Sequence, residues 1–414
     1  MSMTKVTDSS SHRFASAHRR RPRIVAVLAA IALGVLSVVA SGAVASAVPI
    51  YPAPDPDPFY AQTADLATRA NGDVLASRQV PANGFPGATA WQLKYRSTNS
   101  AGAPIAAVTT LLLPPGPGNN RPLVSYQPFI NSLGLQCAPS HTLFNGTLQE
   151  APALNGLLAR GWAVAVPDHL GPQSAYGAAQ LGGRLVLDGI RAVQRFPAAG
   201  LGGSPVGMAG YSGGGMATGW AAALAPTYAP ELRLVGAAQG GVPVNIGQLA
   251  RDLGNTRSPL FGLGFAAALG LEREYPGSID ITDRLKPEGA ALRNQLANAC
   301  TDQIVSAGAN RSYSDVAIGP LEGDPQTNAV LDQNSLQLYP GVPRTPIYAW
   351  HGSADQVPLD LVRQTTARYC AAGVPVLLDV IPGADHGAAI PPGSARAFGY
   401  LGDRFAGVPA PTNC

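Results

Sequence analysis

The sequence predicts an α/β fold in which helices flank a mostly parallel central sheet. Short, continuous apolar runs, the pattern of buried parallel strands, alternate with helix-like stretches along much of the chain. Between about residues 241 and 338 this alternation stops, and helix-like stretches dominate. We therefore expect one large domain over residues 48–414, with an insertion at about 241–338 that forms a helical cap.

Each element is predicted from its local pattern. Residues 104–113 are rich in Val, Thr, Ile and Leu, and the helix at 151–160 ends before Gly161, a typical C-cap residue. The helix at 185–196 is amphipathic and stops at Pro197. The expected strands are 89–95, 104–113, 122–126, 162–166, 205–209, 232–238, 346–350 and 374–381. The expected helices are 151–160, 185–196, 216–225, 260–271, 290–299, 359–369 and 394–405.

Residues 1–47 have the pattern of a secretory signal peptide. A cluster of arginines at 19–23 precedes an apolar, uncharged run over 24–40, and Ala45-Ser46-Ala47 is an A-x-A cleavage signal. We therefore expect a secreted protein, extracellular or associated with the cell envelope. The apolar run is long for a signal peptide, so an uncleaved membrane anchor is the competing interpretation.

Charge argues against one class of partner. The full chain has 28 Lys and Arg and 25 Asp and Glu; residues 1–47 hold six of the basic residues and one acidic residue, which leaves 22 and 24. The mature chain also has no basic run, so nucleic acid is not an expected partner. No feature of the sequence indicates an obligate protein partner.

The cysteines are Cys137, Cys300, Cys370 and Cys414. An even number in an exported chain suggests two disulfides, and the sequence alone permits three ways of pairing them. None of the four lies in C-x-x-C spacing, so a zinc site is not expected. We expect neither a metal nor a cofactor.

The residues Gly210-Tyr211-Ser212-Gly213-Gly214 form a G-x-S-x-G motif. The motif follows the apolar run at 205–209 and precedes the helix-like stretch at 216–225, the strand–turn–helix context of a nucleophile elbow. Small residues on both sides leave room for the strained turn on which the serine sits. A Gly-rich turn without function is the alternative, because a chain with 48 glycines will match this motif by chance.

A serine nucleophile needs a base, and the base needs an acid that orients it. His386 follows the predicted strand at 374–381, and ligands bind at this edge of a parallel sheet. Asp355 follows the strand at 346–350 on the same edge, although a helix N-cap would also explain it. The chain order Ser212, Asp355, His386 is the one this kind of site requires. His351 is interpreted as a hydrogen-bonded structural residue.

The oxyanion of the tetrahedral intermediate needs two hydrogen-bond donors. The first is expected to be the backbone N–H of Gly213, the residue after the nucleophile. The second should come from the loop after the strand at 122–126, where the chain lacks a His-Gly-Gly-Gly sequence. Asn131, in that loop, is our candidate.

The chain resembles the secretory lipase family (yeast lipase A-like) of the α/β-hydrolase superfamily. An ordered set of segments carries the resemblance: 126–132 with 137–140, Pro-Asp-His-Leu-Gly-Pro at 167–172, the serine motif at 210–215, 225–235, 351–358 and 385–386. The resemblance implies an α/β-hydrolase fold, a Ser212–Asp355–His386 triad, and the disulfides Cys137–Cys300 and Cys370–Cys414. One departure is that the family often has an acidic residue where this chain has Asn131.

The same resemblance implies hydrolysis of acylglycerols and other carboxylic esters. The expected partner is therefore an ester or lipid substrate, with contact to a lipid surface through the cap, for which the apolar segment at 260–271 is suited. A buried cap helix is the competing interpretation of that segment. A serine peptidase or acyltransferase on the same scaffold, and a non-catalytic surface protein, are the alternative functions.

Overall fold

The computed structural model describes residues 48–414 with the exception of residues 117, 255 and 320–322. The predicted signal peptide at 1–47 lies outside the described residues. Among the helices that are described, none combines the length and the apolar character needed to cross a membrane.

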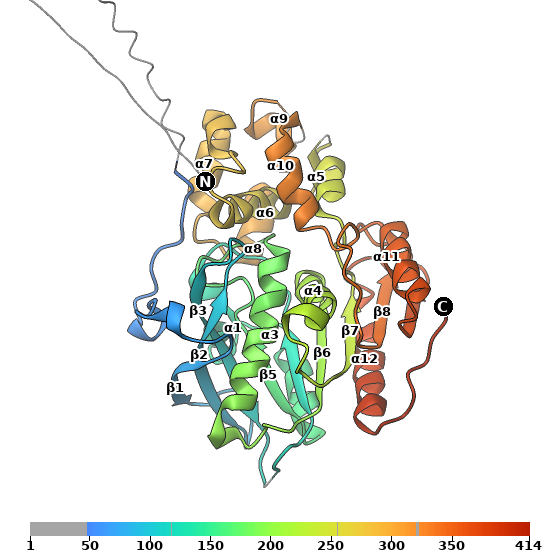
Figure 1. Cartoon of the computed structure of the whole chain (residues 1–414). Coiled ribbons are helices and arrows are strands. Elements are labelled where there is room, and N and C mark those ends of the chain that lie inside the picture. Colours follow the sequence, from blue (N-terminus) through green and yellow to red (C-terminus); the bar gives the residue numbers. More distant parts are fainter. Residues whose placement is uncertain (1–47, 117, 255, 320–322) are drawn as a thin grey trace, which may run out of the picture. The chain divides into compact units, whose positions relative to one another are not determined.

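A nine-stranded sheet forms the centre of the described chain (Figure 1), in the order β1-β2-β3-β5-β4-β6-β7-β8-β9. The first four strands in this order pair antiparallel, and all neighbours from β5 onward are parallel. The sheet and its flanking helices confirm the predicted fold class. The strands are β1 (Val74–Val80), β2 (Thr89–Thr98), β3 (Pro104–Leu113), β4 (Leu123–Gln127), β5 (Ala163–Pro167), β6 (Val206–Tyr211), β7 (Leu234–Gly240), β8 (Ile347–Gly352) and β9 (Val376–Ile381).

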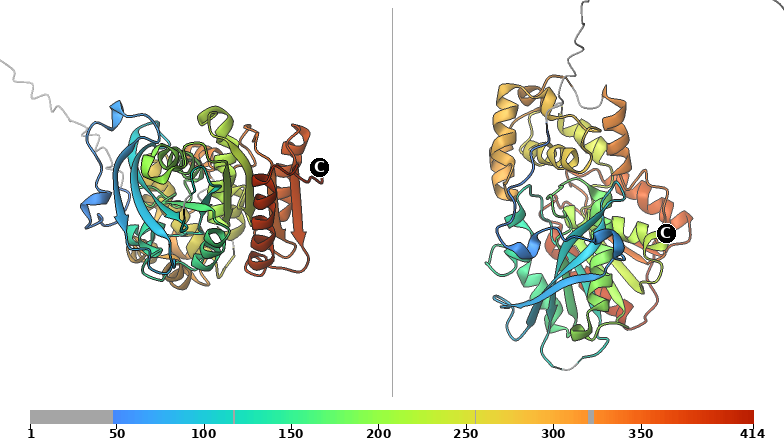
Figure 2. Two further views of the ribbon diagram at one scale, coloured as in Figure 1. Left: turned by 90° about the horizontal axis from the view of Figure 1, so that it is seen from below. Right: turned by 60° about the vertical axis from the view of Figure 1, so that its left-hand side comes forward.

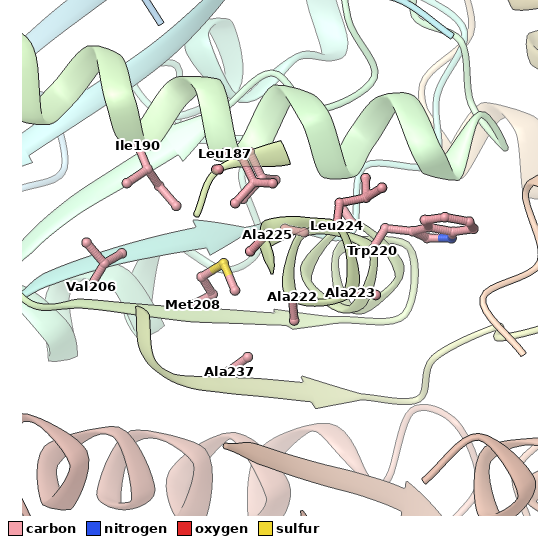
Figure 3. Close-up of a cluster of buried hydrophobic side chains, with 14 of the residues drawn as sticks. Leu187, Ile190, Val206, Met208, Trp220, Ala222, Ala223, Leu224, Ala225 and Ala237 are labelled. Carbon is pink, nitrogen blue, oxygen red and sulfur yellow. The ribbon is translucent and has the colours of Figure 1, made fainter. Parts of the chain in front are cut away.

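Helices cover both faces of the sheet (Figure 2). The helices α3 (Ala179–Arg195), α4 (Gly213–Tyr228) and α11 (Leu359–Ala371) share one apolar cluster with the sheet, part of which is drawn in Figure 3. The helices α2 (Ala151–Ala159) and α12 (Ile390–Phe405) share another. Because side chains alternate along a strand, β6 contributes Met208 to the first cluster and Ala209 to the second.

A close contact between α3 and α4 brings the helix of the serine motif against the rest of the core. A Cβ atom on Gly183 would lie 2.8 Å from the backbone of Trp220, so only glycine allows this approach. Trp220 itself is fully buried in the first cluster. The tight packing fixes the position of α4, whose N-terminus carries the serine motif.

Six α-helices lie between β7 and β8 in the described residues: α5 (Ile246–Gly254), α6 (Phe261–Glu274), α7 (Pro287–Leu296), α8 (Thr301–Gly308), α9 (Tyr313–Val316) and α10 (Pro325–Gln333). Figure 1 shows them gathered beyond one end of the sheet. Apolar residues of α6, α7 and α8 form a separate cluster that includes Leu133 of the core. We call this segment, residues 241–338, the helical insertion.

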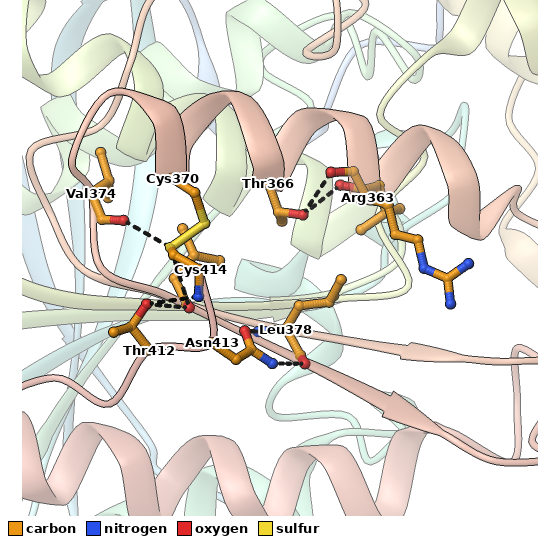
Figure 4. The surroundings of a disulfide bond; sticks show 10 residues. Arg363, Thr366, Cys370, Val374, Leu378, Thr412, Asn413 and Cys414 are labelled. Atoms are coloured by element: carbon orange, nitrogen blue, oxygen red, sulfur yellow. Dashed lines mark hydrogen bonds between the residues drawn. A yellow bond between two sulfur atoms is a disulfide. The ribbon is translucent and has the colours of Figure 1, made fainter.

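Two disulfides, Cys137–Cys300 and Cys370–Cys414, are present, with the pairing that the resemblance implied. Figure 4 shows that Cys414 ties the C-terminal tail to α11. The neighbouring Asn413 bonds both the N–H and the carbonyl of Leu378 at 2.9 and 2.8 Å, along the outer edge of β9. The tail therefore covers a sheet edge that would otherwise present unpaired backbone groups.

Several elements differ from the prediction. Strand β1 was not predicted, because its residues are mostly half-buried and its pattern is weak. Helix α3 begins six residues before the predicted start, since Gly182 and Gly183 lower the helix propensity of its first turns. The helix of the serine motif starts at Gly213 rather than at Met216, and α5, α8 and α10 were not predicted.

Candidate active site

Ser212 stands on a strained turn between β6 and α4. Its backbone has φ +52° and ψ −120°, a conformation that is unfavourable for a residue with a side chain. The turn is held on both sides, by a bond of 2.8 Å from Ser212 N–H to the Gly240 carbonyl and by one of 2.8 Å from Met216 N–H to the Ser212 carbonyl. A Cβ atom on Gly214 would lie 1.9 Å from the Gln127 carbonyl oxygen, so the motif needs glycine at that position.

The three predicted triad side chains lie within hydrogen-bond distance of one another. His386 Nε2 is 2.9 Å from Ser212 Oγ, and His386 Nδ1 is 2.8 and 2.9 Å from the two carboxylate oxygens of Asp355. The side chain of Asp355 is fully buried, whereas 28% of the His386 side chain is exposed. The arrangement can move a proton from the serine hydroxyl to the imidazole while the carboxylate fixes the ring.

Neighbouring groups hold the acid and the base in place. Asp355 Oδ1 accepts the Val357 N–H at 2.8 Å, and the Tyr211 hydroxyl donates to the His386 carbonyl. His351 Nε2 bonds the Val357 carbonyl at 2.9 Å and lies 3.6 Å from the Asp355 carboxylate. Burial lowers the pKa of His351, which keeps the ring neutral beside the acid. Its hydrogen bond agrees with the structural interpretation of this residue.

Asn131 and Gly213 lie side by side. A Cβ atom on Gly213 would be 2.5 Å from Asn131 Oδ1, and Asn131 is 7% exposed. The Asn131 backbone N–H is already bonded to Thr301 Oγ1 at 3.3 Å. Among the described residues, Asn131 Oδ1 has no protein partner. Because amide N and O exchange by rotation of the side-chain amide, this amide can present an N–H to a ligand beside Gly213.

The carboxyl group of Glu150 supports the loop that carries Asn131, and the sequence analysis did not identify it. Its oxygens accept the Phe129 N–H at 3.2 Å and the Tyr126 hydroxyl at 3.2 Å. Burial raises the pKa of Glu150 to about 8, and the two hydrogen bonds only partly oppose this shift. Glu150 precedes α2, so the sequence offers only an acidic residue before a helix, which is common and unspecific.

Two segments that carry the family resemblance meet behind the loop. Asp168 accepts the Ser140 N–H at 2.9 Å and the Ser140 hydroxyl at 2.6 Å, and burial raises the pKa of Asp168 to about 6. Burial lowers the pKa of His169 to about 4, with the Pro167 carbonyl opposing the shift. His169 and Gly213 line the same cavity of about 10 Å³, which is room for one water molecule.

A larger cavity of about 390 Å³ lies between the N-terminal segment and β3, and no triad side chain lines it. The part of the chain that the structure describes contains no cluster of three or more His, Cys, Asp or Glu side chains placed to hold a metal ion.

Several known lipases and related proteins resemble this chain over most of its length. The family model for secretory lipases matches residues 140–413. Lipase A of Moesziomyces aphidis is 31% identical over 81% of this chain and 76% of its own length. A secreted triacylglycerol lipase of Malassezia globosa is 32% identical over 85% of this chain and 79% of its own. A Mycobacterium tuberculosis protein named as a probable inactive lipase is 35% identical over 86% of this chain and 83% of its own length.

Solved structures agree with the fold. Candida antarctica lipase A in its closed state superposes with a TM-score of 0.82 at 29% identity, covering 88% of this chain and 89% of that one. A cell-wall-degrading esterase of Xanthomonas oryzae superposes with a TM-score of 0.64 at 17% identity, covering 82% and 97%. Because the identity to the Xanthomonas oryzae esterase is only 17%, this similarity supports the fold and nothing more.

Proposed function

The chain belongs to the secretory lipase family of α/β-hydrolases and is a carboxylic ester hydrolase, and we propose that it cleaves acylglycerols and related esters with a Ser212–His386–Asp355 triad. The observation that carries this proposal is the unbroken line of hydrogen bonds from Ser212 Oγ through the His386 ring to Asp355. A serine hydroxyl is a poor nucleophile at neutral pH without such a base.

The proposed reaction has two halves. Ser212 Oγ attacks the ester carbonyl carbon while His386 Nε2 takes the hydroxyl proton, and the imidazolium then protonates the departing alcohol. Water next attacks the acyl carbon while His386 Nε2 accepts its proton, and the bond to Ser212 Oγ then breaks as the imidazolium returns that proton to Oγ, which releases the carboxylic acid and regenerates the serine hydroxyl. Throughout, the buried carboxylate of Asp355 stabilises the imidazolium and keeps Nδ1 protonated.

The oxyanion formed in both halves is assigned to the Gly213 N–H and the side-chain amide of Asn131. The Gly213 amide is the first of α4, where the helix dipole also favours negative charge. The Asn131 backbone N–H is engaged by Thr301, which leaves the side chain as the donor of this residue. A neutral amide needs no protonation to donate, unlike the acidic residue often found here in the family.

The helical insertion is proposed to act as the cap over the site. Its apolar helix α6 is mostly buried against α7 and α8, which favours a packing role over direct contact with lipid. Its most exposed large apolar residues that the structure describes are Ile318, at 69%, and Leu338, at 50%. Of the described residues of the insertion, these two are the ones we propose for contact with a lipid surface. Secretion is proposed from the signal pattern at 1–47 and from relatives that are named as secreted.

Turnover of p-nitrophenyl esters of increasing chain length tests the proposal. We expect hydrolysis by the full chain and a loss on the order of a millionfold in kcat for Ser212→Ala. A rise in rate above the solubility limit of the substrate would identify a lipase rather than an esterase of soluble substrates. Cleavage of peptide amides without esterase activity would favour a peptidase, and ester products with an added alcohol would favour an acyltransferase.

A non-catalytic protein is the second candidate, because a relative with 35% identity is named as inactive. This candidate predicts no turnover of any ester and no labelling of Ser212 by a fluorophosphonate probe. Labelling of the wild-type protein, together with no labelling of Ser212→Ala, would exclude it.

A further inference from the structure

One edge of the helical insertion is joined directly to the segment that follows Asn131. Residues 297–301, which comprise the connection between α7 and α8 and the first residue of α8, run beside residues 131–137, and we call this contact the seam. Within it, the Leu133 N–H bonds the Ala299 carbonyl at 3.0 Å and the Asn131 N–H bonds Thr301 Oγ1 at 3.3 Å. The disulfide Cys137–Cys300 closes the same contact covalently.

The buried guanidinium of Arg273 forms hydrogen bonds to both sides of the seam. Arg273, at the end of α6, is 1% exposed and donates to the carbonyls of Leu133 and Ala297 at 2.8 Å each, one on either side of the seam. Its Nε donates to the Ile50 carbonyl, and Nη1, which also bonds Leu133, contacts the carbonyls of Gln173 and Ser174. A buried cation that donates to carbonyls on both sides of the seam is a rigid connection, because these charged donors would be costly to leave without acceptors.

The loop that carries Asn131 is therefore fixed at two points. On the core side, Glu150 accepts the Phe129 N–H, and on the insertion side Thr301 accepts the Asn131 N–H. The Thr301 hydroxyl is not needed to cap α8, because Cys300 is the N-cap and its N–H bonds the Gln303 side chain at 2.9 Å. The acceptor for Asn131 thus comes from a residue 170 positions away in the sequence.

We propose that Thr301 is a positioning residue: its hydroxyl holds the Asn131 backbone so that the side-chain amide faces the oxyanion beside Gly213. The inference rests on the proposed function, in which Asn131 is the second oxyanion donor. It makes the helical insertion part of the catalytic apparatus, since a shift of residues 297–301 moves a donor while the triad stays in place. A displacement of about 1 Å at such a group is enough to reduce a rate substantially.

Three variants measure the effect. Thr301→Val keeps the shape of the side chain and removes the acceptor, so kcat for a soluble p-nitrophenyl ester should fall on the order of tenfold with little change in KM. Thr301→Ser keeps the hydroxyl and should retain most of the activity. Thr282→Val is the matched control, because Thr282 also lies in the helical insertion but donates its hydroxyl to Glu272 at 2.8 Å, and it should leave kcat unchanged.

A double-mutant cycle separates positioning from general damage to the fold. In an Asn131→Ala background the donor is gone, so Thr301→Val should have no further effect on kcat, even if both proteins lose the same thermal stability. An equal fold-loss in the two backgrounds would overturn the inference. No effect of Asn131→Ala itself would instead refute the assignment of the oxyanion donor, and full activity of Ser212→Ala would refute the proposed function.

Discussion

The buried carboxyl of Glu150 gives a quantitative prediction about stability and pH. Burial raises its pKa from 4.5 to about 8, so in the folded protein it stays protonated over a range in which the unfolded chain has ionised it. The unfolded state then binds fewer protons, and the free energy of unfolding falls as pH rises from about 4.5 to about 8. At about 1.4 kcal/mol per pH unit, the fall attributable to Glu150 is on the order of 5 kcal/mol.

The substitution Glu150→Gln removes this titration while keeping an oxygen that can accept the Phe129 N–H. The free energy of unfolding is measured in urea at intervals from pH 5 to pH 9, with the disulfides intact. Relative to the wild type, the stability of the variant should increase as pH rises. Glu231→Gln is a control of opposite sign, because the bonds from Arg191 hold the pKa of Glu231 below its usual value. The stability difference between that control and the wild type should stay constant from pH 5 to pH 9, and the control should become more stable relative to the wild type only as pH falls below about 4.5, where the wild type loses the contribution of the ionised carboxylate.

Parallel curves for wild type and Glu150→Gln over this range would refute the reasoning. They would mean that the two hydrogen bonds from Phe129 and Tyr126 outweigh burial and keep Glu150 ionised in the folded protein. The loop that carries Asn131 would then be held by a charged acceptor rather than a neutral carboxyl.

Three further predictions concern the triad, the seam and the C-terminal tail. Asp355→Asn should reduce kcat about 10⁴-fold, because it favours the wrong tautomer of His386. Asp385→Asn alters only the bond from the Ala388 N–H and should have little effect. Steady-state kinetics on a p-nitrophenyl ester compares the two variants. Arg273→Met should lower the free energy of unfolding by about 3–5 kcal/mol in urea, because it removes the Arg273 donor from the carbonyls of five residues, of which Ser174 alone is known to keep another, the Tyr176 N–H. Replacing Cys370 and Cys414 by serine should cost up to about 4 kcal/mol, from the 44 residues that the disulfide spans, and leave ester turnover at 25 °C unchanged.

Much of the site could be predicted because parallel strands bring their carboxyl ends to one edge of the sheet. Ser212, Asp355 and His386 each follow a strand whose apolar pattern is strong, so their approach follows from topology. Strand β1 lacks such a pattern, and the helices α5, α8 and α10 have only 9, 8 and 9 residues, so none of the four was predicted. The support of Asn131 by Glu150 and Thr301 has no local signal at all, because each contact joins residues 20 or more positions apart.

The triad residues and the loop that carries Asn131 are held in place by different parts of the molecule. The proposed triad is built on strand ends and α4, which the sheet and the core clusters hold rigidly. The proposed oxyanion donor, Asn131, lies on a loop whose two anchors come from a buried acid and from the helical insertion. Because oxyanion stabilisation accounts for a large part of the rate of such enzymes, a chain can keep all three triad residues and still lose much of its activity through this loop. On the proposed role of Thr301, changes within residues 297–301 should therefore reduce activity on the order of tenfold, far less than loss of Ser212 but without any change in the triad.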